Sequence, residues 1–219
     1  EGLRMAEELH LWPEVAIRHA WLGWVAMQRG RFPEARAYAR QALNFTFPHS
    51  QVFAEIVLGL TARYEGDMED AEYRLRALLK ATRPEDGAQP PLFMPLIYVG
   101  LGHTAELRGD LEQAFGLHRE ALAIGIQIEG PRDMAFSLEG MASVLSLTDH
   151  AEPAARFLGA AMTIRRESGM TPGPSERSDI GRAESRLREA LSEKLEPSLT
   201  EGSGLTAEQC LAQAEALTF

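Results

Sequence analysis

The chain has 219 residues, of which 45% are hydrophobic and 25% charged, a composition typical of folded chains with one large or two small domains. Its net charge of −10 excludes a phosphate-neutralising surface, so we expect no direct contact with nucleic acid. The single cysteine excludes an internal disulfide framework, and the apolar runs fall far short of the roughly 20 residues that a membrane span needs, so we expect a cytoplasmic protein without membrane contact.

Helical patterns follow one another along the chain, and no segment shows the alternation of a strand. Residues 1–9 are expected to be the second helix of a repeat whose first half is missing. In chain order, the next predicted segments are the helix pairs 13–29 with 33–46, 50–65 with 69–82, 92–108 with 111–128 and 131–147 with 151–168, and the loops 83–91 and 169–174. A charged helix at 175–195 follows, and Thr206 with Gln209 forms a capping box that opens a last short helix.

Three of the pairs share a pattern of small residues at the same spacing. Each has a Leu-Gly step in its first helix, a second Gly where that helix ends, and an Ala in its second helix. The residues are Leu22, Gly23, Gly30 and Ala35; Leu58, Gly59, Gly66 and Ala71; Leu101, Gly102, Gly109 and Ala114; and, in a weaker fourth copy, Ala142, Ser143, His150 and Ala155. A Gly inside a helix costs about 1 kcal/mol relative to Ala, so a repeated one predicts a close crossing of two helices. The second Gly predicts a tight turn.

These positions resemble the tetratricopeptide pattern, in which each helix pair stacks on the next. The resemblance implies an all-α, tetratricopeptide-like right-handed helical solenoid, here of about eleven helices. The predicted domains are residues 1–168, a half repeat plus four helix pairs, and residues 169–219, a C-terminal extension of two helices that packs on the solenoid.

The C-terminal part carries a second resemblance. Its residues are 138–144 (LEGMASV), 154–161 (AARFLGAA), 174–177 (PSER) and 205–209 (LTAEQ). This series resembles the C-terminal tetratricopeptide-like arm of large bacterial ATP-binding transcriptional regulators of the LuxR and AfsR type. The resemblance implies a nucleotide-binding switch module before the arm, in intramolecular contact with it, and a helix-turn-helix module at one end. In related signalling proteins a kinase or cyclase module precedes the same kind of arm, and the resemblance assigns no catalytic residue to it.

Enzyme motifs are absent from the sequence, which has no phosphate-binding loop, no Gly-x-Ser-x-Gly and no His-Glu-x-x-His. We therefore expect a protein that is not an enzyme, with no catalytic residues and no cofactor. His103 and Glu106 share one helix face, but a metal site would need a third ligand, for which His118 is the nearest candidate. The favoured interpretation is a packed histidine, so no metal is predicted.

Two further features are interpreted as structural. Cys210 is expected to be a small buried hydrophobe. Arg165 and Arg166, followed by Glu167, are expected to lie on a solvated helix face.

The tetratricopeptide resemblance implies a concave groove lined by the first helix of each pair, and the repeat offsets place eight candidate residues there. They are Trp24, Met27, Gln28, Phe53, Arg63, Tyr64, His103 and Glu106. The inward positions are mainly apolar, so the clamp of Lys, Asn and Arg that holds a terminal carboxylate in chaperone-binding relatives is not expected. An apolar floor suits an amphipathic helix, a peptide or a small hydrophobic effector. The alternative is a groove filled by the protein's own helices or a neighbouring domain.

The sequence therefore predicts a non-catalytic sensor and protein-interaction arm of a signal-responsive ATP-dependent transcriptional regulator. The arm would bind a protein, a peptide or a small effector in its groove and shift a nucleotide-controlled equilibrium. The alternative function is a free-standing tetratricopeptide adaptor that assembles partner proteins. The half repeat at the start favours the regulator, because an isolated solenoid needs polar caps.

Overall fold

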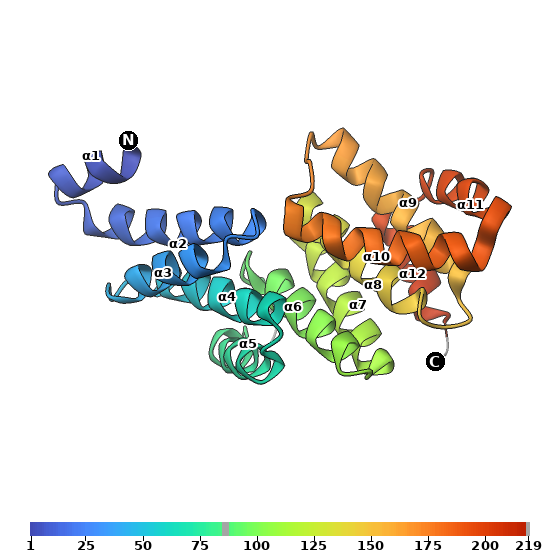
Figure 1. The fold of residues 1–219 in the computed structure, drawn as a ribbon, viewed down its shortest axis with the longest axis horizontal. Coiled ribbons are helices and arrows are strands. Elements are labelled where there is room, and N and C mark those ends of the chain that lie inside the picture. The colour runs from blue at the N-terminus through green and yellow to red at the C-terminus, as the bar shows by residue number, and fades with distance from the viewer. Residues whose placement is uncertain (85–87, 218–219) are drawn as a thin grey trace. The chain divides into compact units, whose positions relative to one another are not determined.

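In a computed structural model, which describes residues 1–84 and 88–217, the chain consists of helices joined by turns and loops (Figure 1). Across these described residues there is no strand, and none of their helices is long and apolar enough to cross a membrane. The all-α prediction is therefore confirmed. The chain forms two compact units, which are residues 1–83 with 173–175 (unit 1) and residues 84–172 with 176–219 (unit 2).

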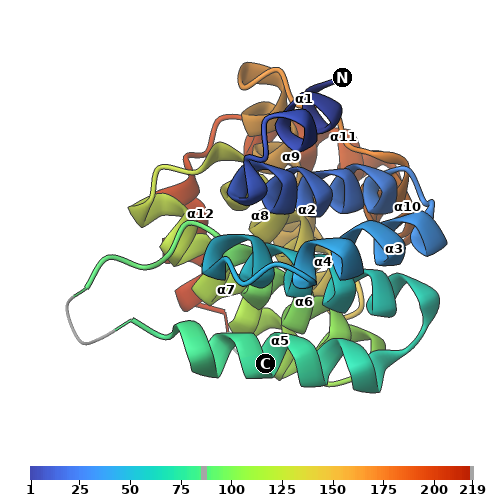
Figure 2. The same ribbon diagram turned by 90° about the vertical axis from the view of Figure 1, so that its left-hand side faces the viewer.

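Unit 1 contains a short helix and two helix hairpins. Its helices are α1 (Gly2–Glu8), α2 (Trp12–Gln28), α3 (Phe32–Leu43), α4 (Pro48–Glu65) and α5 (Met68–Thr82). Proline stands in the first turn of α2, α3 and α4, where its missing N–H costs no hydrogen bond. The Asp67 side chain accepts a hydrogen bond from the Asp70 N–H at 3.0 Å and so caps α5. Figure 2 shows α4 between α2 and α5, and α4 contacts both.

The turns inside the hairpins follow the predicted glycine pattern. Gly30, Gly66 and Gly109 have φ angles of +73°, +87° and +85°, the left-handed region in which a side chain is strained. Each of the three helices can therefore end there and reverse, and the tight turns predicted from the second Gly are confirmed.

The predicted close crossings are present in unit 1. A Cβ added at Gly23 would lie 3.1 Å from the Ala35 carbonyl oxygen of the facing helix. A Cβ at Gly59 would lie 2.9 Å from Leu75 Cγ and 3.6 Å from the Ala71 oxygen. A larger residue at either glycine would push the two helices of the hairpin apart.

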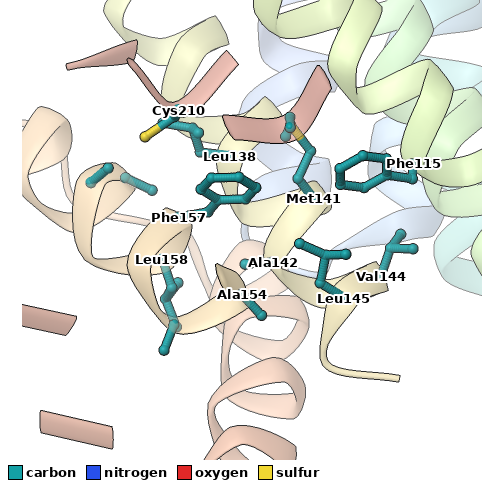
Figure 3. Packing of buried hydrophobic residues seen from close by; sticks show 14 of the residues in the cluster. Phe115, Leu138, Met141, Ala142, Val144, Leu145, Ala154, Phe157, Leu158 and Cys210 are labelled. Atoms are coloured by element: carbon teal, nitrogen blue, oxygen red, sulfur yellow. The ribbon is translucent and has the colours of Figure 1, made fainter. Parts of the chain in front are cut away.

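Unit 2 contains two further hairpins and the C-terminal helices. These are α6 (Met94–Leu107), α7 (Leu111–Gln127), α8 (Pro131–Leu145), α9 (Ala151–Glu167), α10 (Pro174–Leu191, whose first two residues belong to unit 1), the 3₁₀ helix η1 (Ser192–Lys194), α11 (Leu195–Gly202) and α12 (Ala207–Glu215). Figure 3 shows the apolar core of the unit, in which Phe115 of α7, Met141 of α8 and Phe157 of α9 are buried together. Helix α12 adds Cys210 to this core, with an exposure of 0%.

The C-terminal extension has three α-helices where two were predicted. The charged helix predicted at 175–195 ends at Leu191, because Ser192 has a φ of +50° and leaves the helical conformation. Helix α11 then begins at Leu195, with Pro197 in its first turn. The capping box of Thr206 and Gln209 at the start of α12 is confirmed. In the predicted loop 83–91, residues 85–87 lie outside the described residues, and the described remainder is not helical.

Helix α11 is seated closely on α9. A Cβ at Gly159 would overlap with the Leu199 carbonyl oxygen, and a Cβ at Gly202 would overlap with the carbonyl oxygen of Arg156. The two helices therefore touch backbone to backbone, which only glycine allows. This contact fixes α11 on α9 within unit 2.

Candidate functional site

Six of the predicted groove residues belong to unit 1, and most of them lie in its interior. Trp24, Met27, Phe53 and Arg63 have exposures of 7%, 1%, 8% and 4%. The other two, Gln28 and Tyr64, are half-buried. The apolar side chains predicted for the groove floor are thus packed side chains in this structure.

The aromatic members are held in two groups. The rings of Trp24 and Phe53 stack with their centroids 5.8 Å apart, and Trp21 packs against Phe53 at 4.6 Å. We call Trp21, Trp24 and Phe53 the aromatic cluster. In the second group the Tyr64 ring stacks on Phe32 at 5.6 Å, and the Arg63 guanidinium lies 3.8 Å from the Tyr64 centroid, a cation–π contact.

A segment distant in sequence covers the end of α2. The Ser175 hydroxyl donates a hydrogen bond of 2.8 Å to the Met27 carbonyl oxygen, and Ser175 is 6% exposed. A Cβ at Gly173 would lie 2.9 Å from the Gln28 carbonyl oxygen. At Met27 and Gln28, therefore, the protein's own chain occupies the space that a ligand of the groove would need.

The other two groove candidates lie in unit 2, where the structure brings a third residue to them. His103 Nδ1 lies 3.4 Å from Glu106 Oε2, and the His103 and His118 rings are in an edge contact with centroids 4.7 Å apart. One ligand atom from each of His103, Glu106 and His118 lies within 4.8 Å of the other two. We call these three residues the His–Glu cluster.

Polar neighbours surround the carboxylate of this cluster. The Ser143 hydroxyl donates a hydrogen bond of 2.7 Å to Glu106 Oε1, and Arg186 Nη1 lies 3.7 Å from the same oxygen. Burial raises the pKa of Glu106, but the hydrogen bonds from His103 and Ser143 and the nearby histidine charges outweigh it and lower the pKa to about 2. The carboxylate is therefore ionised at neutral pH.

Two glycines make room for the imidazole of His118, which is fully buried. A Cβ at Gly102 of α6 would lie 2.6 Å from His118 Nε2, and a Cβ at Gly140 of α8 would overlap with the ring. The nearest neighbour of Gly102 is thus the His118 ring. His118 is buried because it lies at the hairpin crossing, which the sequence pattern could locate. That His118 also lies close to Glu106 could be seen only in the folded structure.

The sequence did not predict a second buried ionic group, which consists of Arg165, Glu139 and Glu176. Arg165, predicted on a solvated face, is 6% exposed, and its Nη2 lies 2.8 Å from Glu139 Oε2 and 3.1 Å from Glu176 Oε2. Burial raises the pKa of Glu139 despite the opposing charge of Arg165. Ala154, Leu158 and Ala161 stand on the same buried face of α9, and this helical spacing was the available signal. Arg166 is exposed, as predicted.

A pocket of about 450 Å³ lies beside this ionic group, within unit 2. Its lining includes the side chains of Met162, Met170 and Ile180 together with Arg166 and Arg177. Glu139 and Glu184 also line it, so the lining is partly apolar and partly charged, with both signs present.

Two segments of the chain match family models that are described as tetratricopeptide repeat. One match covers residues 93–167 in unit 2 and the other covers residues 22–46 in unit 1. No curated protein and no solved structure matches the chain significantly. Such repeats are generally non-catalytic scaffolds that mediate contacts between proteins. The two matched segments are therefore similar to tetratricopeptide repeats, and the helix hairpins of the described residues give the all-α fold of a helical solenoid.

Proposed function

We propose that this chain is a non-catalytic sensor and protein-interaction arm of a signal-responsive, ATP-dependent transcriptional regulator in the cytoplasm. The tetratricopeptide repeats favour a role in protein interaction. The regulator context is supported by the sequence resemblance at 138–144, 154–161, 174–177 and 205–209. In this proposal the arm also contacts a nucleotide-binding module of the same polypeptide.

One observation carries the interaction role: α2 exposes two apolar residues, Trp21 of the aromatic cluster and Val25. Trp21 is 46% exposed and Val25, one turn later, is 41% exposed. The Trp21 ring rests on Phe53, which is itself stacked on the buried Trp24. A large aromatic side chain on a rigid base, with a second apolar residue beside it, is typical of residues that dominate binding energy at protein interfaces.

The spacing of this face indicates the kind of partner. Residues one turn apart on a helix present a narrow apolar stripe, which is complementary to the apolar face of an amphipathic helix. Of the eight predicted groove residues, Tyr64 and Gln28 are the more accessible ones in unit 1, while Trp24, Met27, Phe53 and Arg63 are buried. The partner is therefore proposed to be a protein or peptide segment with an apolar helical face.

Signal transmission requires that the partner or effector binds one state of the regulator better than the other. A ligand with equal affinity for both states shifts no equilibrium. The ATP-bound and ADP-bound forms of the intact regulator are therefore expected to bind the partner with different affinities. Equal affinities in the two forms would contradict the sensor role.

The experiment is a Trp21→Ala substitution in the intact protein, with partner binding and effector response as readouts. We expect the affinity to fall at least about tenfold, the range of an interface anchor. Tyr73→Ala on α5 is the matched control, because Tyr73 is 75% exposed and stands on a different helix of unit 1. An unchanged response in Trp21→Ala would show that this face does not bind the partner.

A further inference from the structure

The His–Glu cluster of unit 2 is not required by the repeat fold. In the second helix pair the position that faces the Leu-Gly glycine is occupied by Leu75, which packs against Gly59. In the third pair the corresponding residue is His118, which packs against Gly102. An apolar side chain is therefore sufficient for the crossing, and the imidazole of His118 brings a chemistry that packing does not need.

The donor atoms of the cluster are those that transition-metal ions prefer. Imidazole nitrogen and carboxylate oxygen together are typical ligands of Zn²⁺, and sites with an open position commonly use three protein ligands. Glu106 supplies the negative charge, and its ionised form accepts a hydrogen bond from Ser143 through Oε1. Its other oxygen, Oε2, faces His103. A hydrogen bond from a neighbouring side chain to a ligating carboxylate is the usual outer support of such sites.

One ligand–ligand distance in the cluster matches that of two ligands that share one ion. Two ligand atoms bound to a tetrahedral ion at about 2.1 Å lie about 3.4 Å from each other. His103 Nδ1 and Glu106 Oε2 are 3.4 Å apart. This is longer than a charge-assisted hydrogen bond, which measures about 2.8 Å. The three ligand atoms all lie within 4.8 Å of one another, so binding of an ion would draw the three side chains closer together. The His103 side chain is 14% exposed and gives the ion a route from solvent.

We propose that His103, Glu106 and His118 form a binding site for a divalent transition-metal ion of the Zn²⁺ class, with the remaining coordination position taken by water. The ion joins α6, which carries His103 and Glu106, to α7, which carries His118 (Figure 1). Because Gly140 of α8 packs against the His118 ring, the ion also restrains α8. The positive charge of Arg186 opposes binding of the ion, since its guanidinium lies 3.7 Å from Glu106 Oε1. The site is independent of the proposed function, because a chain without any partner can still bind the ion.

The test is a titration of the whole 219-residue chain with ZnCl₂, followed by calorimetry and thermal denaturation. We expect one equivalent of Zn²⁺ to bind and to raise the melting temperature, because an ion that binds only the folded state stabilises it. Co²⁺ in place of Zn²⁺ is expected to give visible absorption bands of a low-symmetry site with nitrogen and oxygen ligands.

Four variants identify the ligands. His103→Gln, Glu106→Gln and His118→Leu are each expected to weaken Zn²⁺ binding at least about tenfold, the minimum loss seen when even an outer neighbour of a metal ligand is removed. His118→Leu introduces the residue type that the second helix pair has at the corresponding position. His103→Gln changes a partly exposed side chain. If one of the two variants fails to fold, the other still tests the site. Arg186→Gln removes the opposing charge and is expected to tighten binding roughly threefold.

The matched control is His49→Gln, because His49 is exposed and lies in α4 of unit 1. Retained one-to-one binding in this control, together with loss in the three ligand variants, supports the site. The proposal is overturned if the whole chain binds no Zn²⁺, or if the three ligand variants bind it as tightly as the unmodified chain. It is also overturned if the His49 substitution removes the binding.

Discussion

The second and third helix pairs contain the same crossing with different side chains in it. In unit 1, Leu75 occupies the space beside Gly59, and in unit 2, His118 occupies the space beside Gly102. Both side chains are fully buried. The leucine side chain is wholly apolar, whereas the histidine brings a ring nitrogen close to the ionised Glu106. The repeat geometry thus decides which position is buried, and the residue at that position decides whether the crossing is inert or chemically active.

The largest expected effect is that of Gly140→Ala, which crowds the crossing in unit 2. The added methyl group would overlap with the His118 ring, so we expect a loss of about 4 kcal/mol in the free energy of unfolding. Urea denaturation measures it. Adding His118→Ala removes the clash, so the double variant is expected to lose clearly less than the sum of the two single losses. Strictly additive losses would mean that the ring is not what Gly140 accommodates.

The apolar crossing is tested by Leu75→Ala. Removing a fully buried leucine side chain leaves a cavity, and we expect a loss of about 3 kcal/mol in the free energy of unfolding. The affinity for Zn²⁺ should stay the same, because Leu75 lies in unit 1 and the His–Glu cluster in unit 2. A changed Zn²⁺ affinity in this variant would show that the two crossings are coupled.

The charge in the unit 2 crossing makes its stability dependent on pH. The pKa of Glu106 is about 2 in the folded protein and 4.5 without its surroundings, so folding is stabilised above pH 4.5 and loses this stabilisation as the pH falls toward 2. The expected loss is on the order of 2 kcal/mol. Glu106→Gln should remove it, which urea denaturation of both proteins at pH 6 and pH 3 will measure. The same pH dependence in both proteins would contradict a lowered pKa for Glu106.

The smallest effect is expected on the surface of unit 1. Trp21→Ala removes a half-exposed ring that contacts Phe53, so the free energy of unfolding should fall by about 1 kcal/mol, while Tyr73→Ala should change it by less than about 0.5 kcal/mol. Thermal denaturation compares the two variants. A loss in Trp21→Ala as large as that of Leu75→Ala would mean that Trp21 belongs to the core and not to a binding face.

The helix pairs were predictable because their signals are local. Gly30, Gly66 and Gly109 mark turns that depend on a few residues of backbone, and the Leu-Gly steps mark crossings within one hairpin. The end of α10 at Leu191 was not predicted, because the charge pattern continues through Ser192 and the break is a backbone conformation.

The candidate sites were only partly predictable, because they depend on residues far apart in sequence. The shared face of His103 and Glu106 follows from their spacing, but the approach of His118 depends on two glycines of neighbouring helices. Arg165 was placed on the surface because its partners Glu139 and Glu176 belong to other helices. Likewise, no pattern near α2 indicates that Ser175 covers Met27.

The burial of Cys210 gives the protein a built-in reporter of its own opening. The chain has one cysteine, Cys210 of α12, and it is fully buried in the core of unit 2. Burial raises the pKa of its thiol to about 12. Alkylating reagents attack thiolates, so the folded molecule should react with them only when α12 detaches. The rate of labelling then measures how often the last helix leaves the core, without any engineered probe.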